Sequence, residues 1–372
     1  MFHLIFGIPW LVVVVRFILP MPWLLSEKAA LAILLLIASQ YHLISRLSSG
    51  SVFSPEFPSP LIIAFNVLFG AIVLLAVFQI ALDLASLVLT PFRGHFPHAP
   101  ANLRYLIGGV ALCLSAYGVS QAIRVPQLKD IEVSIAGLPP EFDGYEIVQL
   151  TDLHISRLFP ASWTKEVVAQ TNALDPDLIV ITGDFIDGSV ENRRQDVAPL
   201  AELRARDGVY AIPGNHEYFF EYQDWMRHLA TMNMMLLPNA HAVLKRGEGR
   251  IVLAGVTDLS ATETGSPAPD LTKALEGAPA DLPIILLDHQ PMMARKSAAS
   301  GVALQLSGHT HGGMVRGLDL LVARVNAGFV SGRYQVADMT LYVSNGTALW
   351  PGFALRIGVP SELTRITLRV KK

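Results

Sequence analysis

The sequence has little charge and almost no cysteine, and each shortage excludes a class of protein. Only 16% of its 372 residues are charged, whereas about a quarter are charged in soluble globular proteins. With 28 basic and 31 acidic side chains, the chain has no excess of positive charge for a nucleic-acid surface, and its 52% hydrophobic content excludes intrinsic disorder. The single cysteine, Cys113, excludes both a disulfide within the chain and a cluster of thiolate metal ligands.

Charge is scarcest in the first third of the chain. Residues 1–123 contain eight charged side chains with a net charge of +2, and the other 51 give residues 124–372 a net charge of −5. Charge-free runs of 17, 26 and 19 residues occupy 29–45, 57–82 and 105–123. Because a helix needs about 20 apolar residues to cross the hydrocarbon core, we expect four transmembrane helices, near residues 4–24, 28–47, 61–89 and 103–123.

The N-terminal region is expected to be a membrane anchor. Its first apolar run lacks a basic start and a small-residue cleavage site, so a retained helix is favoured over a signal peptide. Arg16, inside that run, is expected to reach the membrane interface, and no role is assigned to it. Three basic residues lie near the helix ends on each side, so the positive-inside rule leaves the orientation open. The expected organisation is an anchor at 1–123, a connector with a first strand at 124–145, and a water-facing domain at 146–372.

Beyond residue 130, short apolar runs alternate with amphipathic stretches. The apolar runs predict strands at 146–150, 177–181, 208–212, 251–255 and 283–287, and the helical spacing predicts helices at 161–174, 191–206, 221–232 and 290–300. Strands that alternate with helices indicate an α/β domain. The tail differs, because 322–330, 339–343 and 363–370 are predicted to be strands without helices between them.

Nine side chains suited to metal binding or acid–base chemistry follow the ends of strands in this domain. They are Asp152 and His154 in QLTDLH, Asp184 and Asp187 in ITGDFID, Asn215 and His216 in IPGNHE, His289 in LLDHQ, and His309 and His311 in LQLSGHTHGG. Open α/β sheets bind ligands beyond the carboxyl ends of their strands. We therefore expect these side chains to meet at one edge of the domain.

The residue types favour a particular metal chemistry. Carboxylate oxygens, an amide oxygen and imidazole nitrogens, without thiolate, suit Mn, Fe, Co or Zn, and a carboxylate that bridges two ions would build a hydrolytic two-metal site. Taken singly, each motif also has an ordinary explanation as a capped turn or a buried core histidine. Five groups in this order, all at strand ends, are not explained in that way.

The ordered motifs D-x-H, G-D-x-x-D, G-N-H-E, H and G-H-T-H resemble those of the calcineurin-like metallophosphoesterase superfamily. The similarity extends from about Ile147 to the C-terminus, and the stretches GVYAIPGNHEYF, LDHQP and LYVSNGTALWPGFALRIGVPSELTRITL resemble its membrane-anchored bacterial branch. The resemblance implies a four-layer α/β/β/α sandwich preceded by several transmembrane helices. Two positions depart from the usual pattern: Asp288, expected either beside the ligands or in solvent, and Met314.

The resemblance also implies a role for each of the nine side chains. One metal ion would be held by Asp152, His154 and His311 and a second by Asn215, His289 and His309, with Asp184 bridging both. His216 would act as general acid or phosphate contact, oriented by Asp187. Two divalent ions are implied, with manganese favoured over iron, zinc or cobalt.

The implied activity is hydrolysis of phosphodiester or pyrophosphate bonds, on soluble or lipid-linked phosphates. The alternative is a membrane sensor or scaffold whose domain binds metal or phosphate without turnover, and the intact ligand set argues against it. The expected location is a bacterial inner membrane, with the extracytoplasmic face favoured by resemblance alone. No nucleic-acid partner is expected, and the oligomeric state is left open.

Overall fold

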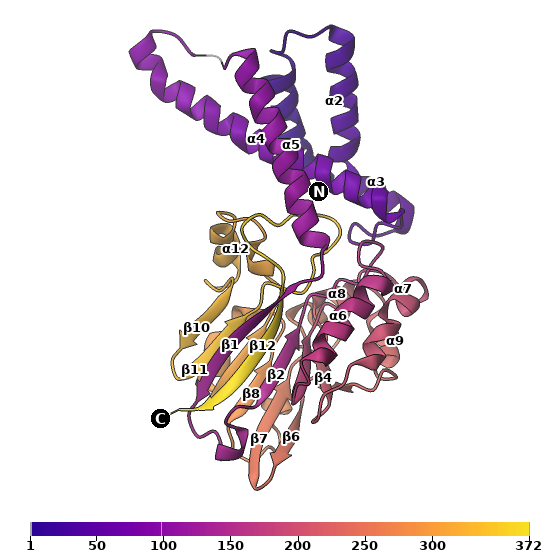
Figure 1. The fold of residues 1–372 in the computed structure, drawn as a ribbon, viewed down its shortest axis with the longest axis vertical. Helices are drawn as coiled ribbons and strands as arrows, with labels where there is room; N and C mark the ends of the chain where they lie inside the picture. Colours follow the sequence, from indigo (N-terminus) through magenta and orange to yellow (C-terminus); the bar gives the residue numbers. More distant parts are fainter. Residues whose placement is uncertain (1, 98, 372) are drawn as a thin grey trace. The chain divides into compact units, whose positions relative to one another are not determined.

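The computed structural model describes residues 2–97 and 99–371, with side chains from residue 6 onward. Their internal contacts divide the chain into two units (Figure 1). The helical unit comprises Met1–Gln121 and Pro351–Ile357, and the two-sheet unit comprises Ala122–Trp350 and Gly358–Lys372.

The N-terminal helices differ in length from the expected set of four spans. They are α1 (Phe2–Val12), the π-helical η1 (Val13–Ile18), α2 (Leu25–Ser39), α3 (Tyr41–Ser49), α4 (Ser59–Arg93) and α5 (Ala101–Ile123). Among the described residues, α4 and α5 are long and apolar enough to cross a membrane, and α2 with α3, bent by 52°, would make a third span. Two or three of the four expected spans thus meet this test, and within the described side chains the first apolar run gives the shorter apolar helix Phe6–Ile18. Pro20 and Pro22 follow it, and proline cannot donate the backbone bonds that would extend the helix.

Arg16 has a partner that the sequence did not reveal. Its Nε and Nη2 donate to the two carboxylate oxygens of Asp83, each at 2.9 Å. Gln79 Nε2 also donates to Asp83, at 2.8 Å. Arg16 therefore forms an ion pair between η1 and α4, rather than only reaching an interface.

A short segment from the C-terminal part of the chain, Pro351–Ile357, belongs to the helical unit. Asn66 of α4 donates to the Pro351 carbonyl at 2.9 Å and accepts from the Ala354 amide at 2.7 Å. The buried Leu355 side chain packs where a Cβ at Gly118 of α5 would come within 2.6 Å of it. The absence of a side chain at Gly118 thus makes room for this segment.

The two-sheet unit contains two mixed six-stranded sheets. The first runs β1 (Gln127–Ile135), β12 (Glu362–Val370), β2 (Glu146–Leu150), β3 (Leu178–Thr182), β4 (Val209–Ile212) and β5 (Met235–Leu236). The second runs β10 (Gly332–Val336), β11 (Met339–Val343), β9 (Val302–Ser307), β8 (Ile284–Leu287), β7 (Gly249–Gly255) and β6 (Ala240–Arg246). The strands from β2 to β5 are parallel to one another, as are β11, β9, β8 and β7.

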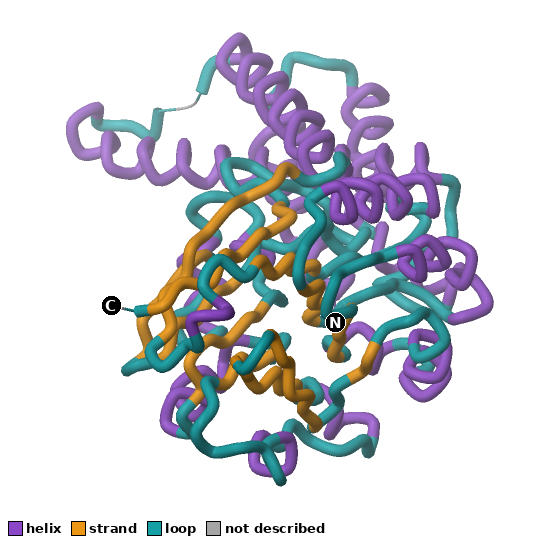
Figure 2. Tube along the Cα trace, turned by 60° about the horizontal axis from the view of Figure 1, so that its bottom comes forward, coloured by secondary structure: helices purple, strands orange, loops and turns teal. Residues whose placement is uncertain are grey.

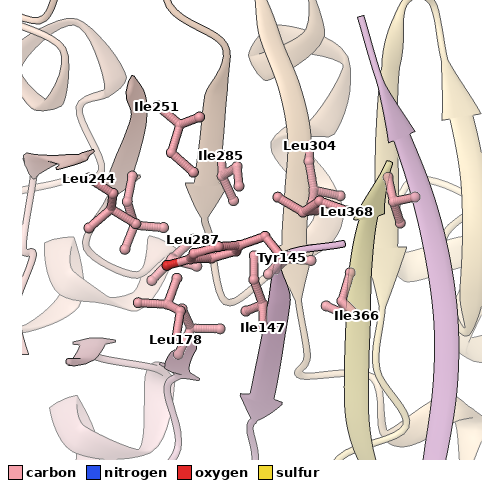
Figure 3. Close-up of a cluster of buried hydrophobic side chains, with 14 of the residues drawn as sticks. Tyr145, Ile147, Leu178, Leu244, Ile251, Ile285, Leu287, Leu304, Ile366 and Leu368 are labelled. Carbon is pink, nitrogen blue, oxygen red and sulfur yellow. The ribbon is translucent and has the colours of Figure 1, made fainter. Parts of the chain in front are cut away.

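The main core lies between the two sheets. Figure 3 shows apolar side chains of both sheets pointing toward one another, among them Ile147 and Leu178 of the first sheet and Ile285 and Leu287 of the second. Leu286, between the last two, belongs to a second buried cluster on the opposite face. This alternation follows from the two-residue period of a strand, and it means that the second sheet is buried on both faces.

Helices cover the outer faces of the sheets. Figure 1 shows α6 (Ala161–Ala173), α7 (Val190–Val197) and α9 (Tyr222–Leu229) grouped beside β2 and β4, and Figure 2 shows the strands in orange among the purple helices. Residues of α10 (Leu271–Ala274) and α11 (Ala294–Ala299) belong to the cluster on the outer face of the second sheet. The predicted α/β/β/α fold class is confirmed.

One predicted strand is wrong. Residues 322–330 do not form a strand, because α12 (Asp319–Val325) is a helix and the next strand, β10, begins only at Gly332. A short apolar run does not distinguish helix from strand by its period alone. The strand prediction assumed that these apolar side chains lie in the core, but no residue of α12 is buried.

Candidate metal centre

The nine predicted side chains come together in one network at strand ends of both sheets. Asp152 and His154 follow β2, Asp184 and Asp187 follow β3, Asn215 and His216 follow β4, His289 follows β8, and His309 and His311 follow β9. Eight of the nine are buried, and His309 is partly buried. Because β2, β3 and β4 are neighbouring parallel strands, their carboxyl ends deliver these loops to the same edge.

Asp184 lies at the centre of the network. Its Oδ2 is 3.2 Å from His289 Nε2, 3.7 Å from His154 Nε2 and 4.0 Å from His216 Nε2. Its other oxygen accepts a hydrogen bond from the His216 backbone amide at 2.8 Å. One carboxylate oxygen therefore faces ring nitrogens from three different loops.

Two groups of donor atoms accompany Asp184. In the first, His154 Nε2 lies 3.3 Å from His311 Nε2, which is 3.7 Å from Asp152 Oδ1. The second group is centred on Asn215, whose Oδ1 lies 3.0 Å from His289 Nε2 and 2.8 Å from His309 Nδ1. Each group gathers oxygen and nitrogen atoms that lie close enough together to bind the same metal ion.

The other ring nitrogens of two histidines are held by oxygen acceptors. His154 Nδ1 lies 3.1 Å from Asp187 Oδ2, and His289 Nδ1 lies 2.7 Å from the Thr182 carbonyl. An N–H at Nδ1 that donates to such an acceptor leaves the lone pair on Nε2, which is the arrangement found in metal-binding histidines. Asp187 also holds His216, through Oδ1 and Nδ1 at 2.5 Å.

Glu217, in the motif GNHE, supports the site although its sequence position did not single it out. Its Oε2 accepts from the amides of Gly214 at 2.7 Å and Asp184 at 3.0 Å, and its Oε1 accepts from Phe185 at 2.8 Å. The side chain is fully buried. Glu217 therefore ties the loop after β4 to the loop after β3 and fixes Asp184.

The backbone at the site is strained. Five of the nine residues adopt a left-handed conformation: Asp152 (φ 53°), His154 (φ 43°), Asp184 (φ 56°), His309 (φ 70°) and His311 (φ 50°). Such conformations cost on the order of 1–3 kcal/mol each in non-glycine residues and gather at functional sites. The strain is maintained because the surrounding hydrogen bonds and packing fix each loop.

Two glycines of the motifs are required by lack of space. A Cβ at Gly214 would lie 2.3 Å from Asp184 Oδ1, and one at Gly308 would lie 2.3 Å from Asp152 Oδ2. The loops that carry the acidic residues can approach their neighbours only without a side chain at these positions.

The buried carboxylates attract positive charge. Burial lowers the pKa of His289, but Asp184 and Asp152 outweigh it and raise that pKa well above its usual value. Burial likewise opposes the charge on His216, yet Asp184 and Asp187 raise its pKa to about 9. Burial and the neighbouring His289 lower the pKa of His309 to about 3, which leaves its ring neutral, the form that binds metals.

The residues fit divalent metal ions. Three sets each have ligand atoms within 4.8 Å of one another: Asp152, His154 and His311; His154, Asp184 and His216; and Asp152, Asp184 and His289. The donors are carboxylate and amide oxygens and imidazole nitrogens, the mixture that suits Mn, Fe, Co or Zn. A buried cluster with several carboxylates is stabilised most directly by cations.

Asp288, next to the candidate ligand His289, does not face solvent. Its side chain is 5% exposed and its Oδ2 accepts from Gln305 Nε2 at 3.3 Å. Burial, with the nearby Asp258, raises the pKa of Asp288 to about 8. The alternative that placed Asp288 in solvent is therefore wrong.

Comparison with known proteins identifies relatives of this chain. Residues 145–313 match the family described as calcineurin-like phosphoesterase. The transmembrane protein with metallophosphoesterase domain of Danio rerio is 35% identical over 269 residues, which cover 70% of this chain and 61% of that protein. An uncharacterized metallophosphoesterase of Helicobacter pylori is 34% identical, with 71% and 70% covered, and one of Bacillus subtilis is 31% identical, with 71% and 93% covered. The chain thus spans about three fifths of the length of the zebrafish relative and most of the length of the Bacillus relative.

Proposed function

Because the chain belongs to the calcineurin-like phosphoesterase family, we propose that it is a metal-dependent hydrolase of phosphodiester or pyrophosphate bonds with a dinuclear metal site. The observation that carries the proposal is the position of Asp184. Its Oδ2 faces His154, from one donor group, and His289, from the other. A carboxylate placed between two sets of ligands is the arrangement that a bridging ligand requires.

The proposed ligands follow from the two donor groups. Asp152, His154 and His311 would hold one ion, and Asn215, His289 and His309 would hold the other, with Asp184 shared. When bound, two divalent ions lower the pKa of a water molecule and stabilise the charge on the phosphoryl oxygens. Manganese is the favoured metal, ahead of iron, zinc and cobalt.

The protein's own contribution to bond cleavage is assigned to His216. Asp187 holds its Nδ1, so that Nε2 points toward Asp184 at the centre of the site. From Nε2 the ring donates a proton to the leaving oxygen as the phosphorus–oxygen bond breaks and the oxygen of water joins the phosphorus. Asp187 acts as the positioning residue for this ring.

The proposal is tested by changing Asp184. Asp184→Asn keeps the shape of the side chain but removes the shared carboxylate, and we expect kcat/KM for a chromogenic phosphodiester with added Mn²⁺ to fall by about 10²–10³ or more. Asp338→Asn, an exposed acidic residue of the same unit, is the matched control. Full activity in Asp184→Asn would overturn the two-metal assignment.

The substrate and location are finer proposals. The apolar helices α4 and α5 support an enzyme that works at a membrane, and lipid-linked phosphates are the substrate class that this position favours. Detergent-solubilised lipid pyrophosphates assayed beside soluble nucleotide diesters would separate the two classes, and preference for the soluble esters would reject the lipid class. The extracytoplasmic face of a bacterial inner membrane is the proposed location, and protease access to the two-sheet unit in sealed vesicles of known orientation tests it.

A further inference from the structure

The helix α12 presents an unusual set of apolar side chains to solvent. Leu320, Leu321 and Val325 are 69%, 57% and 68% exposed, and they are the three most exposed large hydrophobic side chains among the described residues of the two-sheet unit. At 100° per residue they fall within an arc of about 140° of the helix. Large apolar side chains gathered on one exposed helix face mark an interaction surface rather than chance exposure.

A cavity of about 430 Å³ lies at the N-terminal end of this helix. Its wall includes Asp319, the first residue of α12, and Arg316, which precedes the helix by three residues. It also includes Leu128 of β1 and Ser361 next to β12, and every lining residue belongs to the two-sheet unit. The volume lies within the usual range for small-molecule sites, about 300–1,000 Å³.

The cavity contains polar groups that are available to a ligand. Ser361 is 5% exposed, and its Oγ has no hydrogen-bond partner within the part of the chain that the structure describes. Arg316 bonds the Gly358 carbonyl at 3.3 Å and makes no ion pair with a carboxylate of the described residues. The other basic residue, Lys129, is neutralised by Glu362 at 2.7 Å, so Arg316 is the cation that remains to bind an anionic group.

The covalent chain limits how far this cavity can lie from a membrane span. Gln127, which lines it, is four residues beyond Ile123, the last residue of α5. Because an extended chain covers at most about 3.6 Å per residue, Gln127 lies within about 14 Å of that helix end. Gly358, also in the lining, directly follows the segment Pro351–Ile357 of the helical unit. Two separate passages of the chain thus connect residues of the cavity rim covalently to the helical unit.

We propose that α12 and this cavity form a lipid-binding site. Leu320, Leu321 and Val325 enter the interfacial region of the membrane that α5 crosses, and the cavity receives the phosphate-bearing headgroup of one lipid, with its phosphate on Arg316. Exposed apolar side chains with basic residues beside them, here Arg316 and Arg324, are the composition of helices that lie in a membrane interface. The binding does not require hydrolysis, so its failure and the failure of the proposed activity are distinguishable.

The membrane contact is tested on the full chain in proteoliposomes. Because Cys113 is the one cysteine, Cys113→Ser with Leu321→Cys accepts a single environment-sensitive dye on α12. Cys113→Ser with Met292→Cys is the matched control, because Met292 is 40% exposed in the same unit and belongs to another element, the 3-10 turn Pro291–Met293. We expect lipids carrying an acyl-chain quencher to quench the dye at 321 and not at 292, and aqueous iodide to show the reverse order. Equal quenching by iodide at both positions would overturn the proposal, as would protection from iodide at 321 without quenching by lipid, since a protein partner would then cover the helix.

The headgroup site is tested by native mass spectrometry of the purified full chain with phosphatidylglycerol. We expect Arg316→Ala to reduce the lipid-bound fraction about fivefold, the effect of one basic residue at a membrane surface. Arg250→Ala removes an exposed basic residue elsewhere in the same unit and is expected to leave the bound fraction unchanged. Equal lipid binding by Arg316→Ala and the unaltered chain would overturn the assignment of the cavity.

Discussion

The helical unit and the candidate metal centre both bring charged side chains together, but they do so in opposite ways. In the helical unit, Arg16 and Asp83 are matched to each other through two hydrogen bonds of 2.9 Å. At the metal centre, Asp152 and Asp184 lie among histidines whose nitrogens converge on the same points. In the ion pair, the positive and negative charges neutralise each other within the chain. In the second cluster, carboxylate oxygens and ring nitrogens lie together, and a bound cation would stabilise them best.

The difference shows where the fold stores strain. None of the described helical residues outside glycine has a left-handed backbone up to the end of α5, whereas five of the nine site residues do. The ion pair of Arg16 and Asp83 needs no left-handed backbone, because its two side chains face each other across packed helices. Donors from several loops can converge on one point only if each loop bends sharply, and the surrounding bonds stabilise that bend.

The largest expected effect comes from removing His216. His216→Ala should lower kcat/KM by about 10²–10⁴ for esters with poor leaving groups, because proton donation contributes about that much. The loss should be smaller for a nitrophenyl ester, whose leaving oxygen needs no proton. A comparison of the two ester classes measures this, with His228→Ala as a control outside the site. Equal losses for both classes would contradict the role of His216 as an acid.

The second effect tests the internal pairing of the helical unit. Either Arg16→Leu or Asp83→Leu leaves one partly buried charge without its partner, and each is expected to lower the free energy of unfolding by about 1–3 kcal/mol. The double variant should lose less than the sum of the two, because no charge remains unpaired. The free energy of unfolding in detergent, obtained for all four proteins, gives the coupling. Strict additivity would show that the ion pair contributes nothing.

The smallest expected effect concerns the support of Asp184. Glu217→Gln replaces one of the two acceptor oxygens by an NH2 group, so at least one of the three bonds from the amides of Gly214, Asp184 and Phe185 is lost. Residues that orient metal ligands typically change metal affinity by about 10–100-fold. A titration of activity and of calorimetric heat with Mn²⁺ should show weaker binding with KM for the ester little changed. Unaltered Mn²⁺ affinity would mean that Glu217 stabilises the loop without fixing the ligand.

Much of the site could be predicted from the sequence because its residues occur as short motifs directly after strands. Parallel neighbouring strands place their ends together, so the order of DLH, GDFID and GNHE already indicated one shared edge. Glu217 was not singled out, since a glutamate in a helix turn has no distinctive spacing. Two of its partners are backbone amides of another loop. A sequence does not show which backbone amides will bind a side chain, because nearly every residue has one.

The helical unit was harder to predict. Hydropathy located α4 and α5, but it gave Arg16 no partner. That partner is 67 residues away on another helix, and a run of apolar letters contains no information on which helices pack together. The prediction of a strand at 322–330 was wrong for a related reason, because the apolar side chains of α12 lie on the surface of the protein.

The sequence by itself determined that the chain has an apolar helical part and an α/β part, and it indicated which side chains gather at the candidate site. These features depend on local composition and on motifs that lie within a few residues of one another. Only the tertiary structure decided that Asp184 faces two donor groups, that Pro351–Ile357 belongs to the helices, and that α12 leaves three large apolar side chains exposed. Each of these depends on contacts between segments distant in the chain, and such contacts follow from packing that no local pattern specifies.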